Sequence, residues 1–188
     1  MHEDLSAPFG ETEMNDIIRA MKERRSVRGF TDEMPKKEQL EAIAEAGLYA
    51  ASGMGKQAPI IIAVTNKELR DKLSGANCRI GGWTEGFDPF YGAQVVFIVL
   101  SDKSVRTHVY DGSLVMGNLM LAAHSLGLGS IWIHRAKEEF ESYEWKALLS
   151  QLGVTGDYEG IGHCAVGYAA DPLPEAAERK EGRLFWVE

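Results

Sequence analysis

Several features that would place this chain in a familiar class are missing from it. Its only cysteines, Cys78 and Cys164, are too few for a disulfide framework and lack the CxxC spacing of a metal or redox site. We expect both to be reduced, as in the cytoplasm. No apolar stretch is long enough to cross a bilayer, and the acidic first residues lack the apolar segment of a signal peptide. The sequence therefore predicts a cytoplasmic protein without a membrane partner.

A basic surface and the common catalytic motifs are also absent. The formal net charge is -8, which argues against a nucleic-acid partner because such binding needs a broad positive surface. The five histidines show no HxxxH or HExxH spacing, so a metal site is not expected. The sequence also contains neither a nucleophile elbow nor a P-loop, which disfavours serine hydrolases and P-loop NTPases.

What remains is the composition of a globular domain with alternating helices and strands. Hydrophobic residues make up 45% and charged residues 26% of 188 positions, and no linker or repeat divides them, so one domain over 1–188 is expected. Apolar spacing predicts an α+β fold. The expected helices are 13–24, 35–51, 67–74, 109–126 and 137–153, and the expected strands are 58–65, 94–101, 129–134, 160–169 and 182–188.

The segment "ERRSVRGF" (23–30) concentrates positive charge at the end of the first helix. Arg24, Arg25 and Arg28 fall within five residues, and their mutual repulsion must be offset by something negative. One interpretation is that they are solvated or paired with nearby acidic side chains, where they complement the negative end of the helix. The other is that their forked guanidinium groups, with the hydroxyl of Ser26, bind a phosphate. The cluster alone does not decide between these.

Four segments in order resemble the nitroreductase family of flavoproteins. They are "ERRSVRGF", "GLYAASGMGKQAP" (47–59), "LVMGNLMLAAHSLGLGSIWI" (114–133) and "VGYAADPLPEAAERKEGRLFWVE" (166–188). The resemblance covers nearly the whole chain and implies a nitroreductase-like fold. In that fold a central mixed, mainly antiparallel sheet is flanked by helices, and a C-terminal strand reaches the partner subunit. It also implies that the phosphate belongs to FMN.

The resemblance assigns cofactor contacts to the first segment. It implies that Arg24, Arg25 and Ser26 lie near the phosphate and ribityl chain, and that Arg28 lies by the pyrimidine edge of the flavin. A fixed cation there would stabilise the negative charge of the reduced ring and raise its potential.

Two further segments match the family's flavin-binding positions. The loop "SGMGKQ" would reach the FMN of the other subunit and implicates Ser52, Gly53, Met54 and Gln57. Gly55 stands where the family usually has Asn, and Met54 could instead simply face solvent.

The stretch "IHR" would lie along the flavin ring and implicates Ile133, His134 and Arg135, where family members more often end in an acidic residue and glycine. A catalytic role for His134 is weighed against a structural one.

Near the C-terminus, Arg179 and Lys180 match a second pair of phosphate cations. The alternative is a solvated basic tail balanced by the neighbouring glutamates. If one subunit completes the other's site, the chain is a homodimer with FMN at the interface. The apolar helix 109–126, which needs more cover than one chain provides, agrees with this.

The expected activity is that of an NAD(P)H-dependent FMN oxidoreductase. NADH or NADPH would deliver hydride to flavin N5, and a small aromatic acceptor such as a nitroaromatic or quinone would then take it in a ping-pong cycle. The aromatic loop 83–91 either walls the acceptor pocket or closes the core. The alternatives are a specialised member (oxidase, dehalogenase or flavin-processing enzyme) or a non-catalytic FMN-binding sensor or store.

Overall fold

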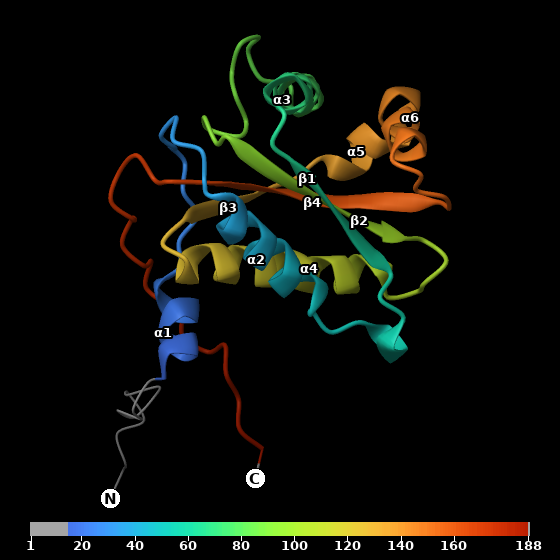
Figure 1. Cartoon of the computed structure of the whole chain (residues 1–188). Coiled ribbons are helices and arrows are strands. Elements are labelled where there is room, and N and C mark those ends of the chain that lie inside the picture. The colour runs from blue at the N-terminus through green and yellow to red at the C-terminus, as the bar shows by residue number, and fades with distance from the viewer. Residues whose placement is uncertain (1–14, 188) are drawn as a thin grey trace, which may run out of the picture.

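A four-stranded sheet lies between two layers of helices (Figure 1). The computed structural model describes residues 15–187. The strands are β1 (Pro59–Val64), β2 (Val95–Asp102), β3 (Gly129–Ile133) and β4 (Tyr158–Gly167). Their order is β1-β2-β4-β3, and every pair is antiparallel. The one parallel element is an isolated bridge between Ser26 and Ser130. Strands β1 and β3 are therefore the two edges of the sheet.

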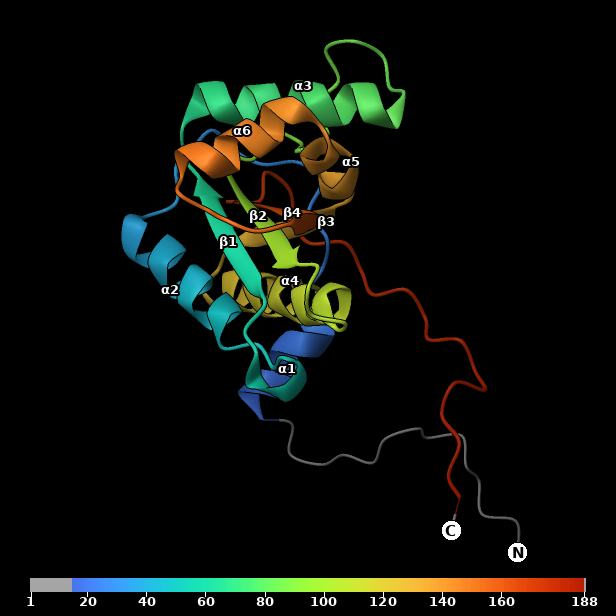
Figure 2. The same ribbon diagram turned by 90° about the vertical axis from the view of Figure 1, so that its right-hand side faces the viewer.

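Helices α2 (Lys37–Leu48) and α4 (His108–Ser125) cover one face of the sheet, while α3 (Lys67–Gly81), α5 (Ala136–Glu141) and α6 (Tyr143–Gln151) cover the other (Figures 1 and 2). Alternation along β2 accounts for this. Val96, Ile98 and Leu100 pack toward the α3 side, while Phe97 and Val99 pack toward α4. A strand buried on both faces reads as a continuous apolar run, which is how this segment reads in the sequence.

Helix α1 (Asp16–Glu23) packs on α4 and not on the sheet. Asn15 caps it by accepting a hydrogen bond from the amide of Ile18. The residues before Asn15, including the start of the expected helix 13–24 and the segment tested for a signal peptide, lie outside the described residues. None of the α1 side chains is buried, although the helix carries a clear apolar stripe.

Three expected elements differ from the structure. Helix α3 continues past residue 74 to Gly81 because Leu73, Ala76 and Asn77 keep one face buried, and Gly82 ends it with a left-handed conformation (φ 69°). The helix expected over 137–153 is two helices that meet at Ser142. The extended backbone of Ser142 (φ -78°, ψ 153°) interrupts the helix, and Phe140 and Trp145 on either side of it are both buried.

The strand expected at 182–188 is not present in the described part of the chain. Residues 183–187 are exposed and unpaired, and the tail they belong to runs down past α1, away from the body (Figure 1). A strand needs a neighbour for its backbone groups, and this chain offers none there. No described helix is long and apolar enough to cross a membrane.

Candidate functional site

The arginine segment runs from the end of α1 along the outer edge of the sheet. Ser26 bridges Ser130 at the start of β3, and the amide of Val27 donates to the Ser130 carbonyl at 3.1 Å. Arg24, Arg25 and Ser26 are half-buried there, whereas Arg28 is exposed. Because β3 is an edge strand, the segment borders a part of the sheet that no further strand covers.

The guanidinium groups of Arg24 and Arg25 are only partly satisfied. Nη1 of Arg25 donates to the carbonyls of Lys22 (2.6 Å) and Arg24 (2.8 Å), at the end of α1. Arg24 Nη1 and Arg25 Nε are buried without a hydrogen-bond partner. Leaving a buried charged donor unpaired is costly. The oxygens of a phosphate are acceptors suited to two such donors on adjacent residues.

The alternative of pairing with nearby acidic side chains is not what the described chain shows. No ion pair joins Arg24, Arg25 or Arg28 to an acidic residue between positions 15 and 187. Burial raises the pKa of the Cys164 thiol to about 12, and the positive charge of Arg24 partly opposes that shift.

The loop 52–57 lies far from the arginine segment of the same chain. It leads into β1, at the opposite edge of the sheet, and sits at the start of α4, whereas Ser26 and Ser130 lie near the end of α4 (Figure 1). Helix α4 has 18 residues and is about 27 Å long. One chain therefore does not bring Ser52, Gly53, Met54 or Gln57 to Arg24.

The loop itself is held in an unusual backbone conformation. Met54 (φ 56°) and Gln57 (φ 49°) are in the left-handed region, which is uncommon for residues other than glycine. The amide of Gly53 donates to Asp111 Oδ1 at 3.0 Å, and the amide of Gln57 donates to Ser52 Oγ at 3.0 Å. The Met54 side chain is 92% exposed.

The segment 133–135 follows β3 at the far end of the edge that Ser26 borders. Ile133 is buried, and the His134 carbonyl accepts a hydrogen bond from Asn77 Nδ2 at 2.9 Å. Arg135 is left-handed (φ 80°), and its guanidinium lies 4.3 Å from the Trp83 ring centroid, within the range of a cation–π contact. The edge of β3 thus carries expected cofactor residues at both ends.

The two expected cations of the C-terminal tail are not brought to this edge. The Arg179 guanidinium donates only to the Ala177 carbonyl, and Lys180 is exposed. The tail that carries them extends away from the body in both views (Figures 1 and 2). Within one chain, these residues have no role at the arginine segment.

The loop 83–91 is both part of the core and part of the surface. Phe90 is fully buried, whereas Trp83 and Phe87 are more than a third exposed and pack against each other with ring centroids 5.2 Å apart. Phe90 thus helps to close the core, whereas the role of the loop as a wall of the acceptor pocket stays a prediction. Its exposed end meets Arg135, and so it borders the segment expected to lie along the flavin.

Sequence reasoning missed Asp88, the residue that fixes the loop 83–91. Asp88 accepts hydrogen bonds from Arg70, Ser74 and the amides of Phe90 and Gly92. Burial acts to raise the pKa of Asp88, but these donors outweigh it and hold the pKa below its usual value. The Asp-Pro pair in "GFDPFYG" is a turn signal that could have identified this residue.

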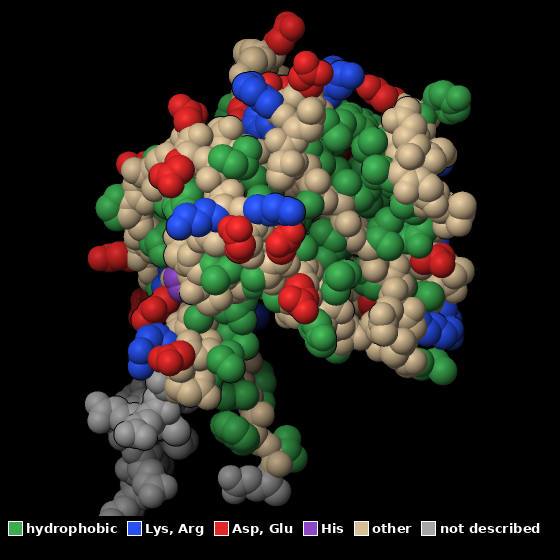
Figure 3. Space-filling model, viewed as in Figure 1, with side chains coloured by type: hydrophobic (Ala, Val, Ile, Leu, Met, Phe, Trp, Pro, Cys, Tyr) green, Lys and Arg blue, Asp and Glu red, His purple; other side chains and the backbone are tan. Residues whose placement is uncertain are grey.

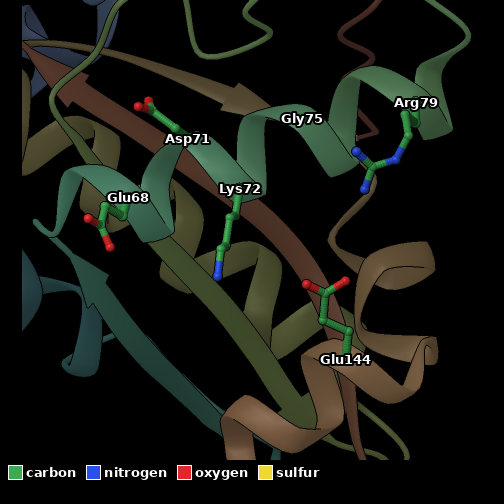
Figure 4. A pocket seen from close by; sticks show the side chains of 6 residues that line it. All are labelled: Glu68, Asp71, Lys72, Gly75, Arg79 and Glu144. Carbon is green, nitrogen blue, oxygen red and sulfur yellow. The ribbon is translucent and has the colours of Figure 1, made fainter.

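One surface hollow lies elsewhere. It has a volume of about 620 Å³ and opens between α3 and α6, where Lys72 and Arg79 extend from one helix and Glu144 rises from the other (Figure 4). Its other lining residues are Glu68, Asp71 and Gly75. None of the expected cofactor residues lines it. No cluster of potential metal ligands occurs among residues 15–187.

Comparison with known proteins gives consistent results. The profile of the Nitroreductase family matches residues 21–78 and 83–168. A putative NADH dehydrogenase/NAD(P)H nitroreductase of Methanothermobacter thermautotrophicus is 31% identical over 127 residues, which is 65% of this chain and 63% of that protein. An FMN reductase [NAD(P)H] of Bacillus subtilis is 30% identical over 137 residues, 63% of this chain and 53% of that protein. The chain thus spans less than two thirds of both relatives.

Solved structures resemble the chain over more of its length. A nitroreductase with bound FMN from Bacteroides fragilis superposes with a TM-score of 0.82 at 32% identity, covering 93% of this chain and 100% of that one. The α+β fold expected from the sequence is therefore confirmed by a relative with the same arrangement.

Proposed function

Because the chain belongs to the nitroreductase family, we propose that it is an FMN-dependent oxidoreductase. It uses NADH or NADPH to reduce nitroaromatic compounds, quinones or similar electron-poor acceptors. Residues 1–188 act as one FMN-binding domain in the cytoplasm, which agrees with two cysteines that are both unpaired and buried. The relatives named above support the cofactor and the hydride donor.

The observation that carries this proposal is the pair of buried, unpartnered guanidinium nitrogens of Arg24 and Arg25. Arg24 and Arg25 would bind the FMN phosphate, with the hydroxyl of Ser26 as a further donor. Phosphate oxygens would supply the acceptors that the folded chain leaves unmet. Arg28, which has no partner among the described residues, would lie by the pyrimidine edge.

FMN supplies the redox chemistry, accepting hydride from the nicotinamide and passing it to the acceptor. The chain itself has to bind the cofactor, orient the donor and the acceptor, and exclude water. Ile133, His134 and Arg135 would lie along the ring, and the carbonyl of His134 is already fixed by Asn77. The exposed aromatic side chains of the loop 83–91 would stack on a flat acceptor. Donor and acceptor would use the same pocket in turn, which is a ping-pong cycle.

The site is completed by a second copy of the chain. Loop 52–57 lies at the other edge of the sheet from Arg24, yet both carry expected cofactor residues. A two-fold dimer would bring the loop of one subunit to the arginine segment of the other. In it, Ser52, Gly53, Met54 and Gln57 serve the partner's FMN. The tail residues Arg179 and Lys180 would also reach the partner, together with the expected C-terminal strand.

The proposed FMN phosphate site is tested with Arg24→Ala. We expect this variant to fold but to lose FMN during purification, because the phosphate loses a donor that nothing else in the chain uses. The measurement is flavin absorbance near about 450 nm, a property of the cofactor itself, relative to protein. Arg19→Ala is the matched control, since it removes the same charge from an exposed position whose guanidinium pairs with Asp16. Full flavin retention by Arg24→Ala would contradict the proposed phosphate site.

Turnover separates the enzyme from a flavin store. The wild-type protein should oxidise NADH or NADPH with menadione or nitrofurazone well above the rate of the same concentration of FMN alone. A rate equal to that of FMN alone would favour a non-catalytic sensor or store. Rapid oxygen uptake without an added acceptor would favour an oxidase within the same family.

A further inference from the structure

Asp111 is a buried carboxylate that no described cation neutralises. It lies in the first turn of α4 and is 3% exposed. Its Oδ1 accepts the amide of Gly53 at 3.0 Å, and its Oδ2 accepts the hydroxyl of Thr107 at 3.0 Å. The positive end of α4 compensates part of the charge. Burying a carboxylate without a neutralising cation is costly unless hydrogen bonds compensate for the lost water. A role for the two hydrogen bonds of Asp111 would explain why it is buried here.

The contact with Gly53 fixes the loop 52–57, and the contact with Thr107 holds the carboxylate that accepts the Gly53 amide. A Cβ on Gly53 would lie 2.3 Å from Thr107 Oγ1, so the loop passes directly against the start of α4. Beyond Gly53, Met54 and Gln57 are in the left-handed region and store backbone strain. Such strain persists only where surrounding contacts fix the conformation. The Asp111 contact is the long-range hydrogen bond that ties Gly53 to the body of the molecule.

The loop 52–57 does not reach the arginine segment of its own chain. Met54 points into solvent with 92% of its side chain exposed, and the arginine segment lies near the other end of α4. We propose that Asp111, aided by Thr107, is a positioning residue for the FMN site of the second copy. It holds the loop 52–57 of one subunit in the conformation that contacts the cofactor of the other. This inference rests on the dimeric FMN site proposed above.

Single variants give the first test. Asp111→Asn and Thr107→Val should each weaken FMN binding about ten- to hundredfold, since each removes or weakens a hydrogen bond to a charged group. Thr107→Ser keeps the hydroxyl and should bind FMN as the wild type does. Asp157→Asn is the matched control: this exposed residue pairs with Lys103 near the same end of the sheet. Its FMN affinity should be unchanged in fluorescence titrations of the apoprotein.

Mixed dimers give the decisive test. An Arg24→Ala chain and an Asp111→Asn chain, each with a different tag, are coexpressed and purified through both tags. If the loop acts on the partner, one FMN site of the mixed dimer combines the altered arginine segment of one chain with the altered loop of the other. The second site then combines the unaltered arginine segment with the unaltered loop. One FMN per dimer should then bind with wild-type affinity. The restored site is built on the Asp111→Asn chain itself, which a general loss of stability in that chain would not allow.

The outcomes separate this inference from the proposed function. Retention of FMN by the Arg24→Ala parent would overturn the FMN site and this inference with it. Loss of FMN by Arg24→Ala but unchanged affinity in Asp111→Asn would overturn the role of Asp111 alone. Two weakened sites in the mixed dimer would overturn the action on the partner. If Asp111→Asn fails to fold, Thr107→Val replaces it in the same mixed dimer, with the same readings.

Discussion

The three arginines of residues 24–28 differ in how much of their hydrogen-bonding capacity the folded chain already uses. Arg25 donates to two carbonyls at the end of α1, Arg24 leaves a buried nitrogen unpaired, and Arg28 is exposed without a described partner. We therefore propose different roles for them. In the proposed site, Arg24 and Arg25 would bind the phosphate, and Arg28 would act as a fixed charge beside the ring.

Replacing Arg28 should change the flavin's potential more than its binding. We expect Arg28→Ala to keep FMN and to lower its reduction potential, because the cation that stabilises the reduced ring is gone. A decrease of about 30 mV would correspond to about 1.4 kcal/mol for a two-electron couple. Spectroelectrochemical titration measures it, with Arg28→Lys as the control that retains the charge. An unchanged potential in Arg28→Ala would remove Arg28 from the pyrimidine edge.

At the scale of elements, the segment that connects α3 to β2 is organised around one carboxylate. Asp88 receives hydrogen bonds from Arg70 and Ser74 on α3 and from the amides of Phe90 and Gly92. Arg70 is buried and also donates to the Ala93 carbonyl at 2.9 Å. The exposed aromatic end of the loop, which borders Arg135, is thereby tied to α3.

Loss of the Asp88 charge should therefore destabilise the fold in a pH-dependent way. Asp88→Asn should lower the free energy of unfolding by about 3 kcal/mol at neutral pH, because it leaves Arg70 buried beside a neutral group. The folded-state pKa of Asp88 is lowered, so its contribution is present above the unfolded value of about 3.9 and is lost as pH falls through the folded pKa. Urea denaturation at several pH values measures it.

The difference between wild type and Asp88→Asn should therefore shrink as the solution is acidified below about pH 4. Asp71→Asn is the control, because this residue also touches Arg70, at 3.2 Å, but its side chain is 47% exposed. Its effect should stay within about 1 kcal/mol. A wild-type advantage over Asp88→Asn that is constant with pH would contradict the assignment.

The order of the elements could be predicted from the sequence, but several boundaries could not. Apolar runs identified β1 to β4. The run of β2 reflects burial on both faces, whereas β1 is an edge strand that is only partly buried. The break at Ser142 was missed because each half of 137–153 has helical periodicity, whereas in the structure the extended backbone of Ser142 separates the two halves. The strand expected at 182–188 depends on a neighbour that one chain does not contain.

The candidate site was predictable only where a local motif marks it. The arginine segment and the loop 52–57 carry such motifs, so their residues could be named in advance. Asp111 and Thr107 carry none, because their role depends on α4 meeting a loop more than fifty residues earlier in the chain. The separation of Arg24 from Met54 likewise depends on strand order, which local patterns do not encode.

At the scale of the whole molecule, the described chain exposes a set of large hydrophobic side chains. Its members lie on α1, on the outer face of α4 and along the C-terminal tail, where hydrophobic side chains hang below the body in Figure 3. They are Ile17, Ile18, Met21, Val109, Tyr110, Leu114, Leu184, Phe185, Trp186 and Val187. A surface of this kind marks an interaction site, and the dimer proposed above would place a second copy on it.

A charge placed on this surface should therefore weaken the dimer and cofactor binding together. Ile17 is 62% exposed on α1, and we expect Ile17→Lys to shift the protein toward single chains and to lower FMN affinity at the same protein concentration. Leu152→Lys is the control, since Leu152 is 53% exposed but follows α6 in the opposite helix layer. Dimer dissociation without loss of FMN would contradict the shared site.

The most direct test of the account is sedimentation velocity of the purified wild-type protein, followed by protein absorbance and by flavin absorbance near about 450 nm. We predict that both signals move together as one species with the mass of two 20.7 kDa chains, carrying one FMN per chain. Flavin that sediments with a single chain, or a dimer that carries no flavin, would contradict it.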